Sequence, residues 1–194
     1  MATATKPETQ RFFGNVEGDQ GAESIPLLPT RVKDGAPPNN KWLMHFVEGE
    51  VAVRHTTSDS WPYINYRSEV DSPDEYAERV VFGMFFFPRD LAEDATDDDQ
   101  EKFEKQQARV VGQIDAVLGA GTCNSLEGET LEEVLTELIP LLENTTFVGK
   151  IGKERGKKVD PDDESKDAER YPDRNRITFF EHEDTWEAPE ASEV

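Results

Sequence analysis

The sequence has little of what membrane, secreted and metal-binding proteins contain. Its 194 residues include one cysteine, Cys123, so no disulfide can form within the chain. No run approaches the about 18 consecutive apolar residues of a membrane span, and residues 1–10 lack the apolar core of a secretory signal. The three histidines, His45, His55 and His182, share no metal-ligand spacing with one another or with Cys123. We therefore expect a soluble cytoplasmic protein with no membrane partner, no bound metal and no cofactor.

Positive charge is also scarce: 21 Lys and Arg face 42 Asp and Glu, which gives a formal charge of −21. The imbalance is uneven along the chain. Residues 90–146 carry 3 basic and 15 acidic groups, and residues 181–194 carry 6 acidic groups and no basic group. Residues 147–180 carry 9 basic and 8 acidic groups. Because a ligand responds to the local surface more than to the net charge, nucleic acid is not excluded as a partner.

Apolar residues are fewer than in most compact domains, at 35% of the chain, against roughly 45–50% on a scale that includes glycine. Part of the chain is therefore expected to lie outside the core. The Gly- and Pro-rich residues 1–39 are predicted to form an extended N-terminal arm. Residues 40–181 are predicted to form the folded domain, and residues 182–194 a disordered acidic tail.

Three strands are predicted in the first half of the domain. Residues 41–54 alternate in polarity around Gly49, where a bulge or bend is expected. Aromatic and β-branched residues indicate a second strand from Trp61, and the run that follows it predicts a single helical turn through Tyr76. Residues 80–87 (VVFGMFFF) are almost all apolar, which is typical of a central strand buried on both faces.

The second half begins with a helical segment. Residues 90–100 are predicted to be a solvated acidic loop, followed by a helix over 102–118. A second helix is expected after Thr130, whose spacing to Glu133 is that of a capping box, and Pro140 is expected to end or kink it. Two strands follow, near residues 145–153 and 175–180.

This order predicts a mainly β fold, namely a five-stranded OB-fold (oligonucleotide-binding) barrel with a helical insertion between strands 3 and 4. A generic α+β sheet with the same elements is the alternative. No catalytic constellation stands out: Cys123 is interpreted as structural, and the acids at 97–99 lack the spacing of a calcium loop. The protein is therefore not expected to be an enzyme.

The strongest functional signal is a set of cations and aromatic residues. Five cations occur within residues 150–158, opposed only by Glu154, and a hairpin of the last two strands would place them beside the final arginines. Cations neutralise phosphates and aromatic faces stack on bases, which is how single strands are bound. The alternative is that the aromatic rings are core and the cations a solvated hairpin. The candidate DNA-binding residues are Arg54, Trp61, Tyr63, Tyr66, Arg67, Lys150, Lys153, Arg155, Lys157, Lys158, Arg174 and Arg176.

Four segments are similar to a pattern in bacteriophage single-stranded DNA-binding proteins. They are SDSWPYI from Ser58, VDSPDEYAERVVF from Val70, FVGKIGKE from Phe147 and YPDRNRI from Tyr171. The resemblance covers residues 40–181. It implies a barrel that coats single-stranded DNA during replication or recombination, with Lys150, Lys153, Arg174 and Arg176 along its groove. It also implies an acidic tail that recruits other proteins, although this chain ends in Val194 where many such tails end in an aromatic residue.

The sequence therefore predicts a non-enzymatic protein that binds and protects single-stranded DNA with weak sequence preference. Its tail would compete for the groove, recruit replication or recombination proteins, or simply maintain solubility. The alternative function is that of an acidic interaction protein that mimics nucleic acid and binds none. Homo-oligomerisation is left open, as is the choice between DNA and RNA.

Overall fold

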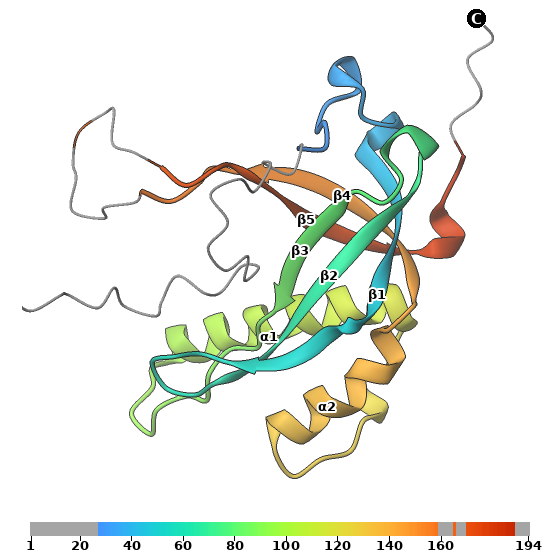
Figure 1. Ribbon diagram of the computed structural model, residues 1–194. Helices are drawn as coiled ribbons and strands as arrows, with labels where there is room; N and C mark the ends of the chain where they lie inside the picture. Colours follow the sequence, from blue (N-terminus) through green and yellow to red (C-terminus); the bar gives the residue numbers. More distant parts are fainter. Residues whose placement is uncertain (1–26, 159–164, 166–169, 189–194) are drawn as a thin grey trace, which may run out of the picture.

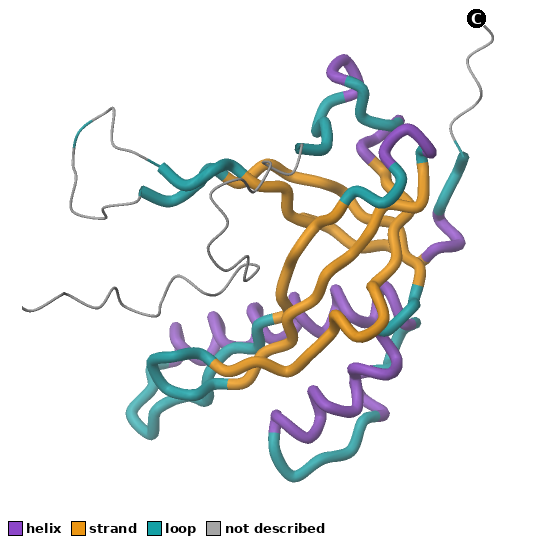
Figure 2. The backbone as a smooth tube through the Cα atoms, in the orientation of Figure 1, coloured by secondary structure: helices purple, strands orange, loops and turns teal. Residues whose placement is uncertain are grey.

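The computed structural model describes residues 27–158, 165 and 170–188. Its main feature is one five-stranded antiparallel sheet in the order β3-β2-β1-β4-β5, and two helices lie near one end of this sheet (Figures 1 and 2). Across these described residues, no helix has both the length and the apolar character needed to cross a membrane. The expectation of a mainly β domain with five strands is confirmed.

The first strand, β1 (Lys41–His55), contains the expected irregularity. Its pairing with β2 (Pro62–Ser72) shifts register between Phe46 and Val51, on either side of Gly49. Gly49 has a φ of 75°, a left-handed conformation that glycine adopts without steric cost. The bend lets a single long strand pair with β2 along both of its halves, and with β4 (Thr146–Glu154) over residues 41–45.

The third strand, β3 (Val80–Phe85), differs from its prediction. It pairs only with β2 and lies at the edge of the sheet, so it is not central. Val81 and Phe85 are buried, whereas Met84 is 37% exposed. The prediction of burial on both faces was wrong because composition alone does not reveal how many layers cover a strand. The expected helical turn is present as a 3-10 helix over Asp74–Tyr76.

Two helices lie between β3 and β4 in the chain, α1 (Asp97–Leu118) and α2 (Leu131–Leu142). α1 begins five residues before its predicted start, because Thr96 and Asp99 form a capping box and acidic side chains favour a helix N-terminus. The predicted capping box of Thr130 with Glu133 is confirmed, and Pro140 lies inside the last turn of α2.

The last two strands form the predicted hairpin, with β4 paired to β5 (Arg174–His182). β5 extends to His182, and a 3-10 helix over Glu183–Thr185 follows. The beginning of the expected disordered tail is therefore structured, whereas residues 189–194 lie outside the described residues. The cause is local, since the Asp184 backbone N–H donates to the His182 ring at 3.3 Å.

The predicted N-terminal arm is described from residue 27 onward. Leu28 is buried, and its backbone is held on both sides by the Asn175 side chain. The Leu28 N–H donates to Asn175 Oδ1 at 2.6 Å, and Asn175 Nδ2 donates to the Leu28 carbonyl at 3.2 Å. This part of the arm therefore packs on β5, and residues 1–26 lie outside the described part of the chain.

The core lies between the curled sheet and the two helices. Its aromatic centre is Phe46, whose ring contacts those of Tyr66, Phe85 and Phe147 at centroid distances of 4.6–6.2 Å. α1 contributes Val110, Ile114 and Val117, and α2 contributes Leu135, Leu138 and Leu142. Burial of these side chains at helical spacing fixes both helices against one end of the sheet.

Candidate nucleic-acid interface

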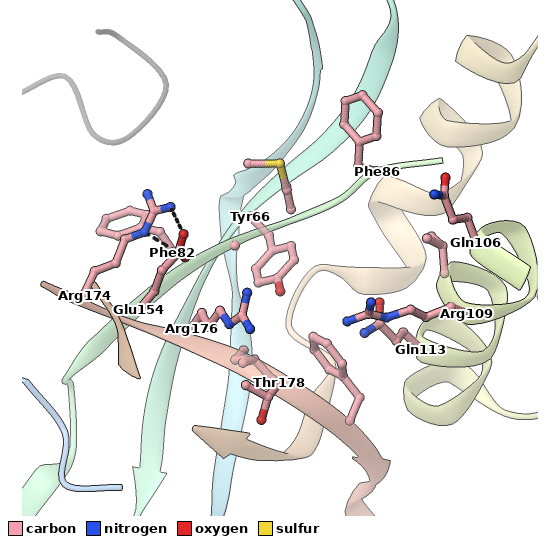
Figure 3. Close-up of a pocket in the computed structure, with 15 residues that line it drawn as sticks. Tyr66, Phe82, Phe86, Gln106, Arg109, Gln113, Glu154, Arg174, Arg176 and Thr178 are labelled. Atoms are coloured by element: carbon pink, nitrogen blue, oxygen red, sulfur yellow. Dashed lines mark hydrogen bonds and ion pairs between the residues drawn. The ribbon is translucent and has the colours of Figure 1, made fainter. Parts of the chain in front are cut away.

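The two outermost strands of the sheet, β3 and β5, border a cavity of about 470 Å³. They contact each other without forming a ladder, and α1 packs against β5 beside them. Figure 3 shows the cavity with side chains from both strands and from α1 facing it. We call this cavity the β3–β5 groove; its lining is Tyr66, Phe82, Gly83, Met84, Phe86, Gln106, Arg109, Val110, Gln113, Glu154, Arg174, Arg176, Ile177, Thr178 and Phe180.

One wall of the groove is apolar and comes from the β3 segment. Phe82, Met84 and Phe86 line it, while Val81, Phe85 and Phe87 are buried in the core. This alternation follows the two-residue period of a strand. The second apolar face of the VVFGMFFF run is therefore a partly exposed row of large side chains with which a ligand could stack. The sequence does not distinguish these residues from core residues, because the run is apolar at nearly every position.

The opposite wall comes from β5 and carries two of the predicted arginines. Arg174, Arg176 and Thr178 line the groove with partly or fully exposed side chains, whereas Ile177, which also borders it, and Asn175 are buried. Arg176 is exposed, and it forms no ion pair within the described residues. Because β5 alternates like β3, the sequence spacing of the two arginines places both side chains on the same face.

Arg174 is held by the only acidic residue of the groove lining, Glu154 on β4. Its Nη2 lies 3.0 Å from Glu154 Oε1, and its Nε donates to Oε2 at 3.2 Å. The hydrogen bond from Arg174 lowers the pKa of Glu154 below its ordinary value. The carboxylate therefore fixes the guanidinium in position, and three arginines against one glutamate leave the lining with a positive charge.

The end of the groove is formed by α1, which contributes Gln106, Arg109 and Gln113. Spacings of three and four residues bring them to one side of the helix, and Figure 3 shows them on the side that faces the strands. The acidic residues of α1 are absent from the lining. Although α1 is strongly acidic in sequence, the one charged side chain that it contributes to the groove is the cation Arg109.

The floor of the groove is aromatic and depends on Gly83. Tyr66 is 2% exposed, and its ring lies where a Gly83 side chain would be. A Cβ built on Gly83 would lie 2.7 Å from Tyr66 Cε2 and closer still to the hydroxyl oxygen. Burial raises the pKa of Tyr66, so its hydroxyl stays protonated at neutral pH.

The other predicted residues of β1 and β2 lie outside the groove. Tyr63 is 3% exposed and packs against Phe86, with ring centroids 5.8 Å apart. Trp61 is half-buried, and its indole N–H donates to the Phe87 carbonyl at 3.1 Å. Arg54 is exposed and is the register partner of Tyr63 in the β1–β2 ladder. Tyr63 and Trp61 thus contact the β3 segment at Phe86 and Phe87 and stabilise its position.

Arg67 is next to the groove but bound to acids. It is the register partner of Phe82, and its Nη2 lies 2.6 Å from Glu69 Oε1, with Glu50 at 3.9 Å from Nη1. Its cation is therefore largely neutralised within the protein. A phosphate at this position would have to compete with two carboxylates.

The predicted lysines are divided between different surfaces. Lys150 lies over the Phe179 ring, 5.2 Å from its centroid, and 3.7 Å from Glu181. Lys153 pairs with Asp173 at 2.8 Å. Neither lysine lines the groove. Arg155 and Lys157 are exposed in the β4–β5 loop, and Lys158 forms an isolated bridge with Arg170 in the same loop.

The β1–β2 loop is tied to the end of the β3 segment. Arg89 forms an ion pair with Asp59, which lowers the pKa of that carboxyl below its usual range. The Arg89 guanidinium also lies over the Phe86 ring, 5.5 Å from its centroid. These contacts orient Phe86, the outermost aromatic residue of the apolar wall.

Cys123 is a half-buried residue that does not line the groove. Its backbone N–H donates to Asp115 Oδ1 at 3.0 Å, and burial together with that carboxylate raises the pKa of its thiol to about 12. We expect iodoacetamide at pH 8 to alkylate Cys123 at least about ten times more slowly than free cysteine, because the thiolate is the reactive form. Equal rates in a mass-spectrometric time course would contradict this.

The described residues contain no group of three or more His, Cys, Asp or Glu side chains that could hold a metal ion. Comparison of the chain with protein-family models, with curated proteins and with solved structures finds no match in any of the three. Inferences about function therefore rest on the groove and on the sequence.

Proposed function

We propose that the protein binds single-stranded DNA in the β3–β5 groove and catalyses no reaction. The observation that carries this proposal is the pairing of two unlike walls: Phe82, Met84 and Phe86 on one side, and Arg174 and Arg176 on the other. Bases can stack on the apolar wall while phosphates contact the guanidinium groups. A double helix offers no free base faces, so this arrangement suits a single strand.

The fold supports the same proposal. We infer that the curled sheet is an OB-fold barrel left open between β3 and β5, since the order β3-β2-β1-β4-β5 would close at that pair. In such barrels the face of the second and third strands and the loops after strands 1 and 4 border the nucleic-acid site. Figure 1 shows the β1–β2 loop and the described parts of the β4–β5 connection, residues 155–158 and 170–173, extending toward the same side.

The similarity to phage proteins suggests the biological setting. The protein would coat and protect single strands during replication or recombination in the host cytoplasm. Its acidic C-terminal residues would recruit proteins of these processes. Local positive charge in the groove and negative charge elsewhere would also orient an approaching strand.

Salt dependence tests the proposal most directly. We expect the affinity for oligo-dT to fall linearly with salt on a double-logarithmic plot, with a slope of about −0.7 per neutralised phosphate. Fluorescence anisotropy across a series of salt concentrations measures it. Two or three contacts with groove arginines predict a slope of roughly −1.4 to −2.1. Binding that ignores salt, or no binding at micromolar protein, would refute the proposal.

The acidic surface supports the second candidate, a protein that mimics nucleic acid. Glu132, Glu133 and Glu137 are exposed together on α2. This candidate predicts that no labelled single strand is bound at any salt concentration. The same titration therefore decides between the two functions.

A further inference from the structure

The end of the β3–β5 groove has a different chemistry from its walls. Gln106, Arg109 and Gln113 of α1 line it together with Tyr66, and Figure 3 shows Arg109 and Gln113 beside the Tyr66 ring. Two amides, a guanidinium and a hydroxyl provide far more hydrogen-bonding atoms than phosphate neutralisation requires. Arg109, the one charged side chain of the three, forms no ion pair within the described part of the chain.

We propose that this end of the groove reads the edge of one unstacked base and that it prefers guanine. The inference rests on the proposed binding of single-stranded DNA and adds to it one sequence-selective position. The cavity of about 470 Å³ lies within the roughly 300–1,000 Å³ of small-molecule sites. A single base displaced from its neighbours can therefore be accommodated beside α1.

The donor pattern favours guanine among the four bases. Arg109 carries only donors, and guanine presents two adjacent acceptors, O6 and N7, that a guanidinium contacts with two hydrogen bonds. The amide oxygens of Gln106 and Gln113 can accept from the N1–H and N2–H₂ of guanine. Adenine places an amino donor beside N7, which would face the Arg109 donors. Thymine has no adjacent pair of acceptors on one edge. Cytosine has such a pair, O2 and N3, but offers only its N4 amino group to the glutamine oxygens, where guanine offers both N1–H and N2–H₂.

Competition between oligonucleotides tests the inference. The probes are oligo-dT of about 15 nucleotides and the same strand with one central dG, dA, dC or 7-deaza-dG. We expect the dG strand to compete about tenfold better than oligo-dT. The 7-deaza-dG strand, which lacks the N7 acceptor, should lose most of that advantage.

Arg109→Lys separates base reading from charge. It keeps the positive charge but loses the planar pair of donors, so the ratio of dG-strand affinity to oligo-dT affinity, measured on the same variant, should fall to about one. Lys105→Gln is the matched control, because Lys105 is exposed one turn earlier on α1 and pairs with Glu101. This control should keep the dG preference.

The outcomes distinguish the two proposals. Salt-dependent binding of all strands with equal affinity would overturn the guanine inference and leave the single-strand proposal intact. A preference for dA or dC, or a dG preference that survives in Arg109→Lys, would overturn the guanine inference as well. Failure of every strand to bind would overturn both proposals.

Discussion

Arg174→Ala/Arg176→Ala is expected to bind oligo-dT about 100-fold more weakly than the unchanged protein. The two guanidinium groups form the basic wall of the β3–β5 groove. A hydrogen bond to a charged group contributes about 1.5 kcal/mol or more, and each 1.4 kcal/mol is about a tenfold change in affinity. The salt slope should also decrease by about 1.4, since two phosphate contacts are lost.

The control for this variant removes two positive charges outside the groove. Lys33 and Lys105 are exposed and do not line the groove, so Lys33→Ala/Lys105→Ala changes the net charge equally. We expect it to reduce affinity by no more than about threefold, through the long-range field alone. Equal losses in the two double variants, in proteins with unchanged melting temperatures, would show that the groove arginines make no direct contacts.

Gly83→Ala is expected to lower the free energy of unfolding by about 2–3 kcal/mol. The new Cβ would overlap the buried ring of Tyr66, which cannot move away because it packs against Phe46 and Phe85. Forcing extra volume into a packed core costs about 1–3 kcal/mol. Urea denaturation monitored by circular dichroism measures the change.

A second glycine is the matched control. Gly112 lies within α1, and a Cβ placed there meets no atom within 4 Å. Gly112→Ala should therefore raise the free energy of unfolding by about 0.5–1 kcal/mol, since alanine is the better helix former. Opposite signs at the two positions are the expected result. A neutral Gly83→Ala would mean that Tyr66 does not form the groove floor as described.

The local sequence was sufficient to predict most elements of the fold. Alternating polarity around Gly49 predicted a bulged β1, and the spacing of Thr130 and Glu133 predicted the start of α2. The start of α1 was missed, because acidic residues 97–99 were interpreted as a solvated loop when they are the favoured first turn of a helix. These features depend on residues close in sequence, where backbone preference and capping decide the structure.

The candidate site was predicted only in part, and the arginines were predicted better than the lysines. Arg174 and Arg176 lie on the part of β5 that pairs with β4 without a register shift, so their shared face followed from their spacing. Lys150 and Lys153 are in contact with Glu181 and Asp173, residues brought near them by the β4–β5 hairpin. Counting charges along the chain does not show which acids will lie beside which bases.

The sequence by itself determined the strands, the helices and the two-residue alternation that gives β3 and β5 two distinct faces. Only the tertiary structure decided that β3 and β5 are the outer strands and that they meet without pairing. It also decided that Arg109 of the most acidic segment faces Phe82 and Arg176 across the groove. The face of a strand to which a side chain points is set by its position along that strand, because successive residues alternate. Its exposure and its charge partners are set by segments that are distant in sequence and pack against it.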